Sequence, residues 1–165
     1  MHRPHRFIAS FRWALLGLAL TASAFAAELY KVGSVFEPFT TKDQHEQSYT
    51  FKPGDASIIL VSFEMGTGKK ANTWLAKQPP SFLADNKALL INNIYGMPGV
   101  GRMFALPKMK KYPHRILLAD EDGFLNRYPA ADNKVTVLRL DAAGVITAVQ
   151  IIDPAKEMDS VFARK

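Results

Sequence analysis

Two short apolar runs stand out from the polar segments around them, residues 57–63 (SIILVSF) and residues 88–91 (ALLI). Neither alternates with polar residues, and the first is rich in β-branched side chains, a pattern typical of strands buried on both faces of a sheet. Between them, apolar positions over residues 72–83 predict a helix, which Pro79 and Pro80 break or restart. The pattern predicts two parallel strands joined by a helical crossover.

Three further elements are predicted by shorter patterns. Apolar residues at helical spacing over residues 102–110 predict a second helix, with Pro107 as a kink or an early end. Residues 114–120 (HRILLAD) predict a short strand, and residues 49–51 form a strand-like patch before a turn.

The clearest pattern lies near the end of the chain. Residues 134–140 (KVTVLRL) alternate, residues 141–144 (DAAG) form a turn, and residues 145–152 (VITAVQII) return. This succession predicts a β-hairpin. Pro154 follows at a position suited to the first turn of a closing helix.

The predicted order is therefore strand, helix, strand, helix, short strand, hairpin and helix. Parallel strands followed by an antiparallel hairpin form a mixed central sheet with helices on both faces, an α/β arrangement with the topology of thioredoxin. The chain is long enough for one hydrophobic core, and no linker divides it. We expect one thioredoxin-like domain over residues 27–165.

Three segments carry a resemblance to a known family. Residues 32–51 (VGSVFEPFTTKDQHEQSYTF) resemble the N-terminal segment of peroxiredoxins and thioredoxin-like exported proteins. Residues 57–63 resemble the first core strand of these proteins, and residues 135–149 (VTVLRLDAAGVITAV) resemble their hairpin. The resemblance covers most of the chain after residue 26 and implies a thioredoxin-like fold.

The chain departs from this family at the redox site. A thioredoxin dithiol would lie near Gly68 and Ala71, and Val135 replaces the family's cis-proline, so we expect a trans peptide bond there. The sequence contains no cysteine, which excludes thiol–disulfide exchange and thiol-dependent peroxide reduction. The chain is thus similar to cysteine-free, exported thioredoxin-like families of unknown function, of which the YtfJ type is one.

The first 26 residues have the layout of a secretory signal peptide. A basic start precedes an apolar run from Trp13 to Leu20, and Ala24 and Ala26 form an A-x-A cleavage site. The largely apolar stretch is shorter than the roughly 20 residues that a spanning helix needs. We expect residues 1–26 to be removed, contact with the membrane to be limited to this segment during export, and the mature protein to be periplasmic.

Removal of the leader also changes the charge. The net charge falls from +6 to +3, because three arginines and no acidic residue leave with the leader. A mildly basic domain of this kind is not expected to bind nucleic acid. His45 and His114 are the histidines that remain, and without thiol partners they predict no metal site. No cofactor is predicted.

Two glycine-containing segments are similar to nucleotide-binding motifs but lack the required spacing. A phosphate-binding loop needs a glycine five residues before the Gly-Lys pair and a Ser or Thr directly after it. Phe63 and Lys70 occupy these two positions, so residues 66–70 (GTGKK) do not match the pattern. We expect a polar loop that leads into the helix. Residues 96–101 (GMPGVG) lack the glycine spacing of a dinucleotide-binding turn.

The carboxyl ends of the parallel strands remain the place where a ligand would bind. The residues expected there are Glu64, Met65, Thr67, Lys69, Lys70, Tyr95, Met97, Asn133 and Val135. Their mixed acidic, basic, aromatic and thioether character suits a non-catalytic module that binds a protein or peptide in the periplasm. The alternatives are a cysteine-independent enzyme that uses Glu64 as acid or base beside Lys69, a flavin-linked oxidoreductase included, or ordinary solvated loops.

Overall fold

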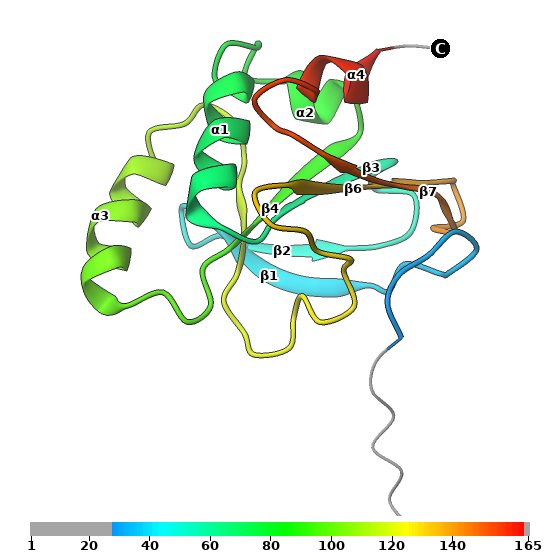
Figure 1. Cartoon of the computed structure of the whole chain (residues 1–165), viewed down its shortest axis with the longest axis horizontal. Helices are drawn as coiled ribbons and strands as arrows, with labels where there is room; N and C mark the ends of the chain where they lie inside the picture. Colours follow the sequence, from blue (N-terminus) through cyan, green and yellow to red (C-terminus); the bar gives the residue numbers. More distant parts are fainter. Residues whose placement is uncertain (1–27, 164–165) are drawn as a thin grey trace, which may run out of the picture.

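The structure of the protein is a computed structural model that describes residues 28–163 (Figure 1). The predicted signal peptide lies outside the described residues, so its cleavage stays a prediction. The described residues form one seven-stranded sheet in the order β2-β1-β5-β4-β3-β6-β7. The strands are β1 (Phe39–Asp43), β2 (Ser48–Phe51), β3 (Ile58–Ser62), β4 (Ala88–Asn93), β5 (Leu117–Ala119), β6 (Val135–Leu140) and β7 (Ile146–Ile152). The helices are α1 (Met65–Leu75), α2 (Phe82–Asp85), α3 (Gly99–Met109) and α4 (Met158–Phe162).

The centre of the sheet agrees with the sequence-based prediction. All five residues of β3 are buried, as its run of four apolar residues before Ser62 indicates. β3 pairs in parallel with β4 and antiparallel with β6, and β6 and β7 form the expected hairpin. The described residues contain no cis peptide bond, so the expectation of a trans bond before Val135 is confirmed.

Two neighbouring crossovers place α1 and α3 together. β3, β4 and β5 are parallel and lie side by side in this order. Right-handed crossovers that advance in one direction put their helices on the same face of a sheet. Side chains of α1 and α3 accordingly pack on the same hydrophobic cluster, Ala71 and Leu75 from α1 and Leu106 and Met109 from α3.

The sheet is covered on both faces. The sequence suggested helices on both faces, but helices contribute to only one of the two clusters. All four helices contribute to the first cluster, and Figure 1 shows α1, α2 and α4 on one side of the sheet. The second cluster is closed by the segments before β1 and after β5, with no side chain from a helix among its members. Aromatic residues fill this face, and Phe36 contacts the rings of Tyr30, Phe51 and Tyr128.

Helix α1 begins earlier than predicted. Met65 starts the helix, so residues 66–70 form its first turns and are not the polar loop that we expected. Glycine disfavours a helix interior by about 1 kcal/mol relative to alanine, which conceals the helix in the sequence. Gly68 has a packing reason: a Cβ there would lie 3.1 Å from Ser62 Oγ and 3.3 Å from Asn92 Nδ2.

The remaining helices and one strand also differ in detail from the prediction. Helix α3 starts at Gly99 and continues through Pro107 to Met109, and α4 starts at Met158, four residues after Pro154. Strand β1 was not predicted, because its sequence FTTKD is mostly polar. No helix of the described part of the chain is long and apolar enough to cross a membrane.

Candidate functional site

A pocket of about 350 Å³ opens where β3 and β4 end, between α1 and α3. We call it the α1–α3 pocket. Helix α1 and the residue before it supply Glu64, Met65, Lys69 and Asn72 to its wall. Helix α3 supplies Phe104, Lys108 and Met109, and the remaining side chains include Asn92, Asn93, Met97 and Tyr112. The pocket thus combines three methionines and two aromatic rings with six polar or charged side chains.

Two buried hydroxyls lie at the junction of β3 and α1. Ser62 Oγ and Thr67 Oγ1 are 2.9 Å apart, and each lies within hydrogen-bond distance of the Glu64 carbonyl oxygen. Both residues are about 1% exposed. These hydroxyls fix the start of α1 and are already engaged, so neither is free to act as a nucleophile.

A second buried polar pair joins α1 to the segment before β5. Asn72 Nδ2 donates to the Gly68 carbonyl oxygen at 2.8 Å, which turns Asn72 Oδ1 toward His114 Nε2, also at 2.8 Å. Nε2 therefore carries the hydrogen. Burial lowers the pKa of His114 to about 4, so the ring is neutral at neutral pH. Its Nδ1 atom is then a bare acceptor, without a partner among the described residues.

Asn92, which lines the pocket, also carries a buried acceptor atom without a hydrogen-bond partner among the described residues. The residue is 3% exposed, and its Oδ1 atom has no hydrogen-bond partner within the described part of the chain. Most buried polar atoms in proteins are paired. Asn92 lines the α1–α3 pocket, so its carboxamide is a candidate group for contact with a ligand.

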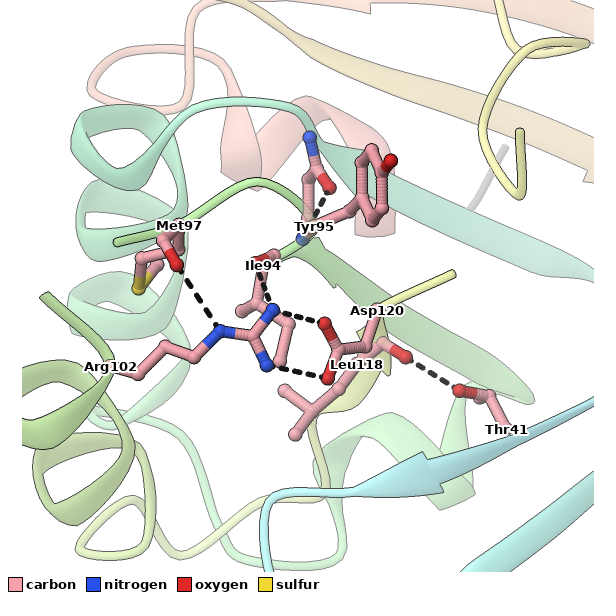
Figure 2. Close-up of polar contacts among 8 residues, drawn as sticks. Thr41, Ile94, Tyr95, Met97, Arg102, Leu118 and Asp120 are labelled. Atoms are coloured by element: carbon pink, nitrogen blue, oxygen red, sulfur yellow. Dashed lines mark hydrogen bonds and ion pairs between the residues drawn. The ribbon is translucent and has the colours of Figure 1, made fainter. Parts of the chain in front are cut away.

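Helix α3 is held by polar contacts at its first turns (Figure 2). Figure 2 shows the Arg102 guanidinium facing both carboxylate oxygens of Asp120, with Nη1 to Oδ2 at 2.7 Å. The same side chain donates to the carbonyl oxygens of Ile94 at 3.0 Å and Met97 at 3.3 Å. No residue of α3 is buried. A single arginine thus joins the helix, the loop before it and the end of β5.

One face of α3 is apolar and open to solvent. Val100, Met103 and Phe104 are more than 60% exposed, and their i, i+3, i+4 spacing places them side by side. We call these three residues the α3 apolar face. Phe104 also lines the α1–α3 pocket, so this face continues the pocket outward.

The structure brings four of the nine expected site residues together. Glu64, Met65, Lys69 and Met97 line the pocket. The Glu64 carboxylate accepts a hydrogen bond from the backbone N–H of Asn133 at 3.1 Å, so Asn133 supports the rim through its main chain.

The other four expected residues lie elsewhere. Thr67 is buried at the start of α1, and Val135 is fully buried in the core. Lys70 lies on a different side of α1, beside Trp74 and Pro154. Tyr95 is half exposed on the loop after β4, outside the pocket lining.

Sequence reasoning missed most of the pocket lining. Phe104 and Met109 were recognised only as apolar positions of a predicted helix. Asn72 and Asn92 gave no signal, because a single asparagine at the end of a strand or in a helix has many ordinary uses. Their importance depends on segments that only the fold brings together.

Comparison with known proteins identifies the fold. No protein-family model matches the sequence, and no curated protein sequence is significantly similar to it. Among solved structures, the thioredoxin domain of a thiol-disulfide oxidoreductase from Bacteroides vulgatus is 18% identical, with a TM-score of 0.54 over 82% of this chain and 99% of that chain. The chain has a thioredoxin-like fold.

Two peroxiredoxin-type structures support the same conclusion. A peroxidoxin from Mycobacterium tuberculosis is 14% identical, with a TM-score of 0.53 over 80% of this chain and 94% of that chain. A peroxiredoxin-like protein from Aquifex aeolicus is 10% identical, with a TM-score of 0.52 over 83% of this chain and 86% of that chain. The present chain shares their fold but has no cysteine, which fits a non-redox role.

Proposed function

We propose that the protein is a non-catalytic binding module of the periplasm, related to the exported, cysteine-free thioredoxin-like proteins. It binds a polypeptide partner through the α1–α3 pocket and the α3 apolar face. The observation that carries this proposal is the exposure of Val100, Met103 and Phe104 on a helix without a buried residue. Contiguous apolar side chains that a fold leaves in solvent beside a pocket are typical of an interaction site.

The polar groups of the site favour binding over catalysis. The Ser62 and Thr67 hydroxyls are engaged with one another and with the main chain. Glu64 holds the backbone N–H of Asn133, and none of the ion pairs between described residues joins it to Lys69. An acid–base pair between these two side chains is therefore not assembled.

The periplasmic location rests on the sequence of the leader. In the periplasm, an exposed apolar face beside cationic side chains would be accessible to other exported proteins. Lys69 and Lys108 flank the pocket, and neither takes part in an ion pair with a described residue. Such cations steer an acidic partner toward the pocket.

A photo-crosslinking experiment tests the proposal. A photoreactive phenylalanine at position 104 is compared with the same residue at position 32, because Val32 is 63% exposed on the segment before β1. In a Gram-negative periplasm, we expect a discrete crosslinked partner from position 104 and not from position 32. Competition by unlabelled wild-type protein should remove the adduct, and Phe104→Asp protein should not compete.

The opposite pattern would reject the site. If Phe104→Asp competes as well as the wild type, the partner does not use the α3 apolar face. If both positions give the same adducts, the contacts are unspecific and the proposed function falls.

A further inference from the structure

Asn92 is a buried polar residue in the lining of the α1–α3 pocket. Its Oδ1 atom is a buried acceptor without a partner among the described residues. The terminal bond of an asparagine side chain turns easily, so the oxygen can swing toward a ligand without movement of the main chain. A ligand that donates a hydrogen bond would therefore be preferred over one of the same shape that cannot.

The side-chain amides of the two other asparagines in the pocket lining are already engaged. Asn72 Nδ2 donates to the Gly68 carbonyl oxygen, and Asn93 Nδ2 donates to the Phe63 carbonyl oxygen at 3.3 Å. The backbone N–H of Tyr95 donates to Asn93 Oδ1 at 3.1 Å. None of these groups pairs with Asn92 Oδ1, which has no partner among the described residues.

The rest of the lining suits an aromatic ring. Met65, Met97 and Met109 contribute thioethers, which make favourable contacts with aromatic rings, and Phe104 and Tyr112 contribute ring edges and faces. A volume of about 350 Å³ accommodates one large aromatic side chain. Among side chains, tryptophan and tyrosine combine such a ring with a single N–H or O–H donor.

The surroundings indicate that this ring belongs to a polypeptide. Val100 and Met103 are exposed beyond the pocket, so a ligand confined to it would leave them uncovered. The rim carries Lys69 and Lys108 without ionic partners among the described residues, whereas the Glu64 carboxylate is engaged by Asn133. Acidic residues next to the aromatic side chain would complement this rim.

We infer that the α1–α3 pocket receives a tryptophan or tyrosine side chain from an acidic segment of a partner polypeptide, and that its N–H or O–H donates to Asn92 Oδ1. This inference rests on the proposed binding function and specifies its ligand. The α3 apolar face then covers the residues that follow the aromatic anchor. Discrimination arises because an anchor without a donor would leave the Asn92 oxygen unpaired in the complex.

Synthetic peptides test the anchor directly. The probes are acetyl-Asp-Glu-Trp-Asp-Glu-amide, the same peptide with 3-benzothienylalanine, which has the shape of tryptophan but sulfur in place of the N–H, and the same peptide with leucine. Dissociation constants are measured by NMR titration of residues 27–165. We expect the tryptophan peptide to bind about tenfold more tightly than the benzothienyl peptide, the effect of one hydrogen bond.

Variants assign the preference to one side chain. In Asn92→Leu the tryptophan and benzothienyl peptides should bind equally, whereas Asn126→Leu, a change at an exposed asparagine on a distant turn, should retain the preference. Replacement of the peptide's acidic residues by glutamine should weaken binding to the wild type and leave a Lys69→Gln/Lys108→Gln variant less affected.

Each contrary outcome overturns the inference. Equal binding of the two aromatic peptides to wild type removes the role of the Asn92 oxygen, and this comparison needs no variant. Absence of binding by all peptides, or a preference that persists in Asn92→Leu, excludes the anchor. The proposed function survives these results if position 104 still crosslinks a partner, and it falls only if the crosslinking experiment fails.

Discussion

At the scale of single residues, His114 shows how the fold changes the chemistry of a side chain. The ring is 3% exposed, and Asn72 Oδ1 accepts its Nε2–H. Desolvation lowers its pKa from 6.5 to about 4. The native protein therefore keeps this histidine neutral in a pH range where an unfolded chain would protonate it.

This difference predicts a pH dependence of stability. Between pH 6.5 and about 4, the unfolded state binds a proton that the native state does not bind, so the free energy of unfolding should fall as the pH falls through this window. Above pH 6.5 the contribution of His114 is fully present. Urea denaturation at several pH values should show a smaller decrease in the free energy of unfolding over this pH range for His114→Gln than for the wild type. Identical slopes would mean that His114 titrates in the native state as it does in the unfolded chain.

At the scale of the elements, α1 and β3 show what the sequence can and cannot predict. The run of buried residues in β3 is visible because burial on both faces favours apolar side chains, which occupy four of its five positions. The start of α1 is hidden, because Gly66 and Gly68 lower the helix propensity and the close approach of Gly68 to Ser62 and Asn92 is visible only in the fold. The pocket is hidden for the same reason: its walls meet only after α1 and α3 are placed on one face.

A pair of glycine substitutions separates propensity from packing in α1. A Cβ at Gly66 meets no atom within 4 Å, so Gly66→Ala should stabilise the protein by about 0.5–1 kcal/mol. At Gly68 a Cβ would press against Ser62 Oγ and Asn92 Nδ2, which should cancel or reverse the gain. Thermal denaturation of the two variants measures the difference. Equal stabilisation by both substitutions would show that Ser62 Oγ and Asn92 Nδ2 can move away from the new Cβ without loss of stability.

The anchorage of α3 gives a second prediction for an element. Arg102→Lys removes the two-pronged contact with Asp120 and the donors to Ile94 and Met97. Amide hydrogen exchange in α3 should become several-fold faster, while exchange in β3 and β4 stays unchanged, because a partly exposed ion pair contributes at most about 1 kcal/mol to global stability. Lys110→Gln, which removes the exposed pair with Glu46, is the control and should leave α3 unchanged. Faster exchange throughout the sheet would contradict a local role for Arg102.

At the scale of the whole molecule, two phenylalanines contrast the closed face of the sheet with the open site. Phe36 is fully buried among aromatic rings on the face without helices. Phe104 is 61% exposed on α3. The first serves the core, and the second adds an exposed apolar surface that folding alone does not require.

The two alanine substitutions should therefore differ sharply. Phe36→Ala should lower the free energy of unfolding by about 3–5 kcal/mol, the cost of a large cavity, whereas Phe104→Ala should change it by less than about 0.5 kcal/mol. Chemical denaturation measures both values. A large loss in Phe104→Ala would assign that ring to the stability of the fold and weaken the argument for a binding face.

The narrow seam between β1 and β5 has a consequence for the order of folding. Two residue pairs join these strands, Lys42 with Leu118 and Asp43 with Leu117. Figure 2 shows the Thr41 hydroxyl contact to the Leu118 carbonyl oxygen, which spans 77 residues of sequence. During synthesis the β1–β2 hairpin emerges early but has to wait for β5, and closing so long a loop is entropically unfavourable. The first hairpin to be made should thus be the last to dock, and until then its unpaired edge is the segment most exposed to aggregation.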